Sequence, residues 1–193
     1  MINKRSLTYL LICWLLSFWA QPILSKVDPP NYDFSLDSFA PFMPGKTLSE
    51  LNKIYSQNTK MEDADGGVIY RFYVEQLRYR FPVFVLVKGD IIDNFYATLP
   101  SYFLHDVFHQ SIINRYGMQQ TYKKVEESAV YIWNNVNGNS HVYSGTCTIT
   151  CFPLYYAVFP AGSTSTLLKK FSDHSNFGKE PKQSPKAEEA LAL

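Results

Sequence analysis

Two histidines lie four residues apart in the segment His105-Asp106-Val107-Phe108-His109, which holds the residue types and the spacing best suited to chemistry. On a helix, residues four positions apart share a face. The imidazoles of His105 and His109 could therefore both reach one zinc ion. This pattern makes metal binding, and with it metal-assisted hydrolysis, one hypothesis for the function.

Asp106 stands where the helical zinc-protease motif has glutamate, and its shorter side chain would lie further from a metal-bound water. A third metal ligand would have to come from a distant part of the chain, and His141 and Asp93 are the candidates. The alternative interpretation is that both imidazoles form hydrogen bonds in the core or at its edge. We expect no cofactor.

A second chemical pair is Cys147 and Cys151, the cysteines that follow the N-terminal segment containing Cys13. An even pair in an exported chain is typical of a disulfide. A straight strand would hold their Cα atoms about 13 Å apart, whereas a disulfide needs less than about 7 Å. A bridge therefore requires a tight turn or a bulge. Two free buried thiols and a redox-active pair are the alternatives.

Arginines and tyrosines gather in one region of the middle of the chain. Both residue types are enriched among interface hot spots, although they are also ordinary residues of exposed strands. We expect a protein-binding face formed by Tyr70, Arg71, Tyr73, Arg78, Arg80 and Trp133.

The N-terminus has the proportions of a cleavable signal peptide. Lys4 and Arg5 precede about 14 mostly apolar residues, a run shorter than the about 20 that a membrane-spanning helix needs. We expect cleavage after Ser25, with Ala20 as the alternative position, and no stable membrane span after cleavage. An uncleaved anchor remains the alternative. The prediction is a protein of the periplasm or the cell exterior.

The charge of the chain argues against nucleic acid as a partner. The sequence has 18 Lys and Arg against 17 Asp and Glu. Removal of Lys4 and Arg5 leaves 16 against 17, a net charge of −1 for residues 26–193. Phosphate binding requires a clustered excess of cations, so we expect no nucleic-acid partner.

Periodicity predicts a first unit over 46–99, after an irregular lead-in over 26–45 that places Tyr32, Phe34, Phe39 and Phe42 against the domain. Thr47 and Glu50 form a capping-box pattern, which predicts a helix over about 47–57. A polar loop with Asp63, Asp65, Gly66 and Gly67 should then lead to alternating strand-like runs that end at residue 99.

A second unit over 100–161 follows the same order. Ser101 is placed to begin a helix and Gly117 to end it. Three runs of β-formers follow, over 129–133, 141–147 and 151–159. From about residue 162 the chain is polar and low in complexity, so we expect a disordered tail over 162–193. The fold prediction is α+β: two helix-plus-antiparallel-strand repeats that form a two-layer sandwich.

The stretch Gly45-Lys46-Thr47-Leu48-Ser49-Glu50-Leu51 and the stretch Ile113-Asn114-Arg115-Tyr116-Gly117, followed by Val130-Tyr131-Ile132-Trp133, carry a resemblance. This pattern resembles the helix-strand-strand repeats of β-lactamase-inhibitor-like proteins and of the small lipoprotein of the outer-membrane β-barrel assembly machinery. The Gly-x-Pro expected after the helices and the acylated cysteine of the lipoprotein are missing. The resemblance implies an envelope protein that binds another protein through its sheet, without catalysis.

The leading hypothesis is therefore an exported, non-enzymatic envelope or secreted protein that binds another envelope or extracellular protein. The alternatives are a metal-assisted hydrolase centred on His105 and His109, and a carrier of an apolar ligand held between helices and sheet.

Overall fold

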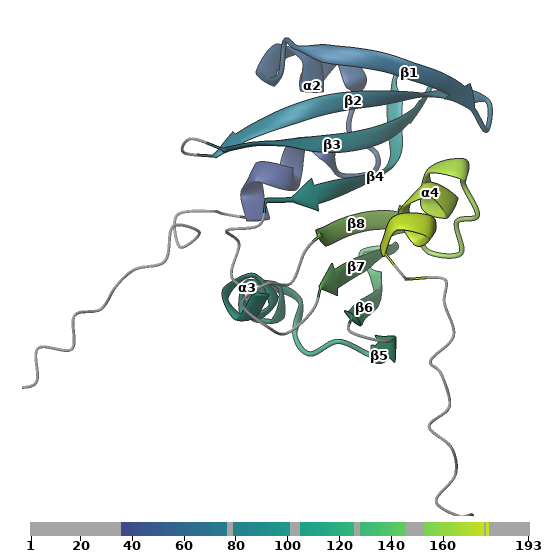
Figure 1. Ribbon diagram of the computed structural model, residues 1–193. Helices are drawn as coiled ribbons and strands as arrows, with labels where there is room; N and C mark the ends of the chain where they lie inside the picture. The colour runs from purple at the N-terminus through teal and green to yellow at the C-terminus, as the bar shows by residue number, and fades with distance from the viewer. Residues whose placement is uncertain are drawn as a thin grey trace, which may run out of the picture.

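The computed structural model describes residues 36–76, 79–100, 105–125, 128–145, 153–175 and 177. Its centre is one antiparallel sheet of eight strands in the order β1-β2-β3-β4-β8-β7-β6-β5 (Figure 1). The strands are β1 (Asn58–Ala64), β2 (Gly67–Gln76), β3 (Tyr79–Lys88), β4 (Ile91–Leu99), β5 (Thr121–Val125), β6 (Ser128–Val136), β7 (Asn139–Gly145) and β8 (Leu154–Pro160).

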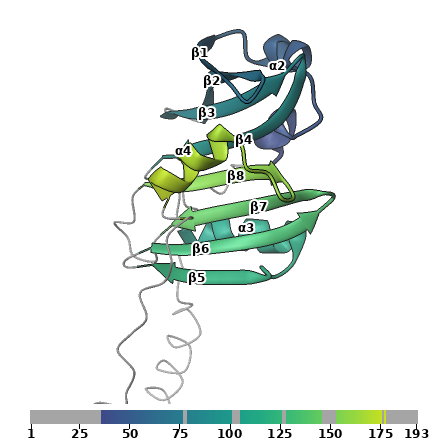
Figure 2. The same cartoon turned by 90° about the vertical axis from the view of Figure 1, so that its right-hand side faces the viewer.

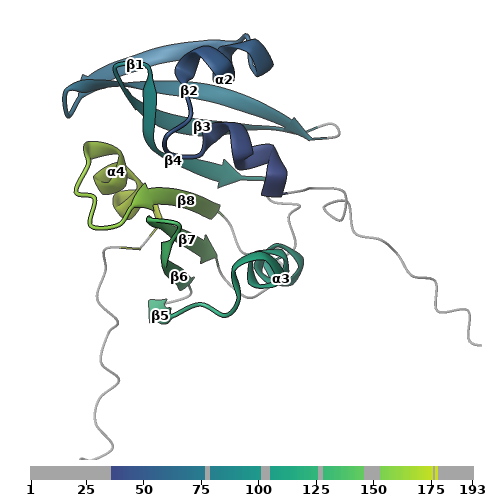
Figure 3. The same ribbon diagram turned by 180° about the vertical axis from the view of Figure 1, so that it is seen from behind.

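Four helices accompany the sheet: the 3-10 helix η1 (Leu36–Phe42) and the α-helices α2 (Leu48–Ile54), α3 (His105–Tyr116) and α4 (Thr166–Ser175). The first three pack on one face of the sheet, and α4 packs on the other. Figure 2 shows α4 in front of the strands and α3 behind them, and Figure 3 shows the molecule from behind relative to Figure 1. The α+β class with an antiparallel sheet is confirmed, and α4 adds a partial third layer to the expected two.

The helix predicted over 47–57 is α2, and its start follows from the capping box. The Glu50 backbone N–H donates to Thr47 Oγ1 over 3.1 Å, and the Thr47 N–H donates to the Glu50 carboxylate over 3.5 Å. The end of α3 also follows the prediction: Gly117 has a φ of 78°, a conformation that glycine adopts without steric cost. Ser101 lies outside the described residues.

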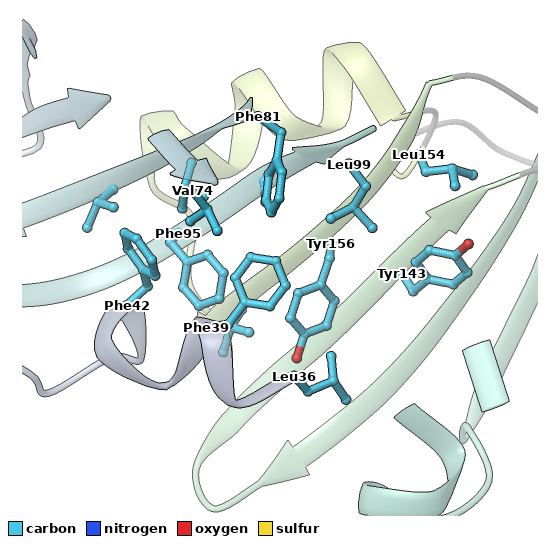
Figure 4. Close-up of a cluster of buried hydrophobic side chains, with 14 of the residues drawn as sticks. Leu36, Phe39, Phe42, Val74, Phe81, Phe95, Leu99, Tyr143, Leu154 and Tyr156 are labelled. Atoms are coloured by element: carbon cyan, nitrogen blue, oxygen red, sulfur yellow. The ribbon is translucent and has the colours of Figure 1, made fainter. Parts of the chain in front are cut away.

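The described part of the lead-in segment packs on the sheet as expected, although it is not wholly irregular. Tyr32 and Phe34 lie outside the described residues. Its residues 36–42 form η1, and Phe39 and Phe42 are fully buried. The Phe39 ring stacks on Phe95 with 5.7 Å between centroids and lies 5.2 Å from the ring of Tyr156. Figure 4 shows these rings meeting between η1 and the strands. This aromatic cluster ties β4 and β8, which are distant in sequence, at the centre of the sheet.

Three parts of the prediction are wrong. Residues 121–125, for which no strand was expected, form the edge strand β5. Residues 58–64, expected as a polar loop, form the edge strand β1, which is paired with β2 from Asn58↔Phe72 to Ala64↔Gly67. The tail expected to be disordered over 162–193 contains α4, whose Leu167 and Phe171 are fully buried. No helix in the described parts of the chain is long and apolar enough to cross a membrane.

Candidate binding site

Three of the expected binding residues meet at one end of the sheet. Arg71 and Tyr73 alternate on β2 and point to the α4 side, opposite to the buried side chains of Phe72 and Val74. Arg80 lies on β3, opposite Glu75 in the β2–β3 register. The guanidinium carbon of Arg80 lies 4.1 Å from the centroid of the Tyr73 ring, and the guanidinium carbon of Arg71 lies 5.4 Å from it. We call Arg71, Tyr73 and Arg80 the basic–aromatic face.

Neither guanidinium on the basic–aromatic face is neutralised by a carboxylate in the described part of the chain. Arg80 donates a hydrogen bond to Gln57 Oε1 over 3.2 Å. The buried Arg71 Nε has no hydrogen-bond partner among the described residues. Cation–π contact holds both groups against one ring and leaves their remaining donors available. A planar guanidinium binds a carboxylate or a phosphate with two parallel hydrogen bonds, so this arrangement can take up an anionic group.

A hollow of about 360 Å³ adjoins the basic–aromatic face, beside the connection between α2 and β1. It is lined by Ile54, Tyr55, Ser56, Gln57, Tyr73, Glu75 and Arg80. Its walls combine an aliphatic side chain, two phenol rings, two neutral polar groups and one charge of each sign. Such a mixed lining suits the side chains of a polypeptide better than a purely apolar ligand.

The other expected binding residues do not join this face. Trp133 is fully buried, and its indole N–H donates to the Gly117 carbonyl oxygen over 2.7 Å. Tyr70 lies on the opposite side of β2, partly buried against the core cluster. Arg78 falls outside the described residues. Trp133 is therefore wrong as a surface contact: its position on β6 faces inward, toward α3.

His105 and His109 do share the inner face of α3, and their rings stack with centroids 5.5 Å apart. His105 Nδ1 lies 3.0 Å from the Tyr143 hydroxyl, and His105 Nε2 lies 3.3 Å from the Tyr131 hydroxyl. The His109 ring packs 4.0 Å from the ring of Tyr131. Both ring nitrogens of His105 are thus occupied by phenol hydroxyls, the arrangement of a hydrogen-bonded core histidine.

The proposed third metal ligands are engaged elsewhere. His141 is buried, and its Nδ1 lies 2.7 Å from the Tyr156 hydroxyl. Asp93 forms an ion pair with Lys88 over 3.2 Å and accepts a hydrogen bond from Asn94 over 2.8 Å. Within the described ranges, no three His, Cys, Asp or Glu side chains are grouped so that they could hold a metal ion. Cys147 and Cys151 lie outside those ranges.

Burial determines the protonation of the polar groups beneath α3. Loss of hydration lowers the pKa of His141 to about 4, so the imidazole is neutral at physiological pH. Burial likewise raises the pKa of Tyr156 well above its usual value. The hydrogen-bonded pair is therefore uncharged, and it has the character of a structural contact.

The loop before α4 and the β1–β2 turn hold a second group of polar residues. Asp65 accepts hydrogen bonds from the backbone N–H and the hydroxyl of Thr166, and these bonds lower the pKa of the Asp65 carboxyl. Asp65 also lines a hollow of about 380 Å³ with Lys88, Asp93, Pro160 and residues 161–165. Because its charged groups already have protein partners, this region anchors α4 to the β1–β2 turn.

Sequence reasoning missed Gln57 and Glu75 at the candidate binding site. The period-2 pattern of β2 would have placed Glu75 on the same side as Arg71 and Tyr73. Gln57 comes from the α2–β1 connection, and only the fold brings it to Arg80. No protein-family model, no curated protein and no solved structure matches this chain.

Proposed function

We propose that this chain is an exported, non-enzymatic protein that binds another envelope or extracellular protein through the basic–aromatic face. The observation that carries the proposal is the Arg71–Tyr73–Arg80 stack, in which two guanidiniums share one ring and have no carboxylate partner among the described residues. Arginine and tyrosine supply much of the binding energy at protein interfaces. The adjoining mixed hollow offers room for a side chain of the partner.

Export is part of the proposal and rests on the sequence. The positively charged start and the apolar run of residues 7–20 match a signal peptide. Intact mass measurement of the protein isolated from the cell envelope or the medium tests this directly. We expect a chain that begins at Lys26, and a chain that still begins at Met1 would contradict it.

We further propose that the two halves are repeats of one unit. The order of elements supports this, because α2 is followed by β1–β4, and α3 is followed by β5–β8. The outer strands β1 and β5 are the first of their halves, and the last strands β4 and β8 pair at the centre. The proposal keeps the expected resemblance to β-lactamase-inhibitor-like repeat proteins, which implies binding through the sheet.

Site-specific crosslinking in the organism that makes the protein tests the binding function. A photo-reactive benzoyl-phenylalanine at Tyr73 should form a covalent adduct with a partner protein. The same residue at Tyr122 is the matched control, because Tyr122 is a half-exposed tyrosine at the far end of the sheet and on the α3 side. An adduct from both positions, or from neither, would contradict the proposal.

Charge reversal identifies the contact that the adduct depends on. The double substitution Arg71→Glu and Arg80→Glu should abolish the Tyr73 adduct, because it removes both guanidiniums from the ring. Circular dichroism at increasing temperature should show that the variant still unfolds in one cooperative transition, since both side chains are outside the core clusters. An adduct that persists in this variant would contradict a role for the two arginines.

A further inference from the structure

The C-terminal end of α4 and the basic–aromatic face lie on the same side of the sheet. One row of residues, paired from strand to strand, runs between them. Tyr73 pairs with Pro82, Thr98 pairs with Tyr155, and Tyr155 pairs with Ser144. The β3–β4 register, in which Val83 pairs with Ala97, places Pro82 opposite Thr98 and completes the row. The Ser144 hydroxyl donates to the carbonyl oxygen of Ser175, the last residue of α4, over 2.6 Å.

This row gives the distance between the end of α4 and Tyr73. Ser144 and Tyr73 are separated by four strand spacings of about 4.8 Å, or roughly 19 Å. Thirteen residues lead from Ser175 to Glu188, and an extended chain of that length spans up to about 43 Å. Residues 188–193 therefore can reach the basic–aromatic face without crossing an edge of the sheet.

The chemistry of residues 188–193 complements this face. Their sequence is Glu188-Glu189-Ala190-Leu191-Ala192-Leu193, two carboxylates followed by an apolar stretch. The face presents two guanidiniums at Tyr73, with the half-buried Pro82 and Phe84 beside them toward α4. One guanidinium can bind one carboxylate through two parallel hydrogen bonds, and the leucines match the half-buried apolar side chains.

We infer that residues 188–193 of this chain occupy the basic–aromatic face in the absence of a partner, with Glu188 and Glu189 at Arg71 and Arg80. This inference deepens the proposed function, since a partner protein then has to displace an intramolecular occupant of the same site. Two ion pairs at a solvent-accessible surface contribute modestly, so the occupant is exchangeable. The segment acts as a competitor that raises the partner concentration needed for binding.

The test uses the purified full chain alone, with benzoyl-phenylalanine at Tyr73 and proteolysis followed by mass spectrometry. We expect an intramolecular link to a peptide that contains residues 188–193, and no such link from Tyr122. Glu188→Lys with Glu189→Lys should reduce the yield about fivefold. Adding Arg71→Glu and Arg80→Glu to that variant should restore it, because the charges are then exchanged.

The tail substitutions change none of the described residues, so their result does not depend on the folding of the arginine variants. Absence of the link in the full chain, or a yield unaffected by charge reversal of the two glutamates, would overturn the inference. A link between two copies, with a yield that rises with protein concentration, would also overturn it. A Tyr73 adduct with a partner in cells, together with no link to the tail, would overturn this inference and leave the proposed function intact.

Discussion

The buried imidazole of His141 gives the structure a pH dependence that can be measured. His141 is 3% exposed, lies within 2.7 Å of the Tyr156 hydroxyl, and has its ring 4.3 Å from that of Tyr116. Burial lowers its pKa to about 4, against about 6.5 in an unfolded chain. The test acidifies two proteins, the wild type and His141→Asn. In the variant the amide can still reach the Tyr156 hydroxyl but does not titrate.

The sign follows from proton binding. Between pH 6.5 and 4 the unfolded chain binds a proton at His141 that the folded chain does not, so acid favours unfolding. The stabilisation from neutral His141 is fully present above pH 6.5 and is lost progressively toward pH 4. At 1.36 kcal/mol per pKa unit, the free energy of unfolding should fall by about 2 kcal/mol through this group alone between pH 7.5 and 5.

Urea unfolding at pH 7.5 and pH 5, followed by tryptophan fluorescence, provides the assay. Other titrating groups contribute to both proteins and cancel in the comparison. The wild type should lose about 2 kcal/mol more than His141→Asn over this interval. His174→Asn, at an exposed histidine of α4, is the control and should lose as much as the wild type. Equal losses in wild type and His141→Asn would refute the assignment of a buried neutral imidazole.

Three further substitutions test the packing around the site. Phe171→Ala should destabilise the fold by about 3–5 kcal/mol, because this fully buried ring joins α4 to Tyr96 and Phe159; a loss under 1 kcal/mol in urea unfolding would show that α4 is not docked. Asp65→Asn should cost about 1 kcal/mol by weakening the bonds to Thr166, whereas Asp63→Asn, which loses the exposed pair with Lys60, should leave the urea midpoint unchanged. Trp133→Phe should lower the free energy of unfolding by about 1–3 kcal/mol through loss of the hydrogen bond to Gly117. It should leave the Tyr73 adduct unchanged. Loss of the adduct without destabilisation would contradict the placement of Trp133 in the core.

Much of the fold was predictable wherever local patterns carry the information. The Thr47–Glu50 capping box and the Gly117 helix end depend on residues three or four positions apart, and the structure confirms both. The central strands alternate or run apolar because both of their faces are buried. Such signals can be read within one element and need no knowledge of its neighbours.

The two edge strands were missed for a common physical reason. Six of the seven residues of β1 are exposed, so its sequence carries no alternation of apolar and polar side chains. β5 is short and contains Lys123 and Lys124. Charged, short edges protect a sheet from pairing with other chains, and the same property removes the hydrophobic pattern from which strands are predicted.

The segment with α4 was missed because its apolar residues are few and are surrounded by polar ones. Leu167 and Phe171, four positions apart, form one narrow stripe that is buried only because the sheet offers Tyr96, Tyr155 and Phe159 as partners. Composition averaged over 162–193 hides such a stripe. A search for apolar residues four positions apart, which share one face of a helix, would have found this stripe.

Half of the expected binding face could be derived from period-2 alternation. Arg71 and Tyr73 share a side of β2, and their proximity to Arg80 depends on the β2–β3 register. Tyr70 is excluded by the same alternation, since odd and even positions point to opposite sides. The burial of Trp133 depends on α3 covering β6, which no local pattern specifies.

The affinity of the crosslinked partner, once purified, for wild-type protein and for Arg71→Glu with Arg80→Glu tests the central claim most directly. Isothermal titration calorimetry with the same partner preparation compares the two. If the two arginines are hot spots of this interface, the double substitution should weaken binding at least about thirtyfold, while the variant still unfolds cooperatively in urea. Equal dissociation constants for the two proteins would contradict the basic–aromatic face as the binding site.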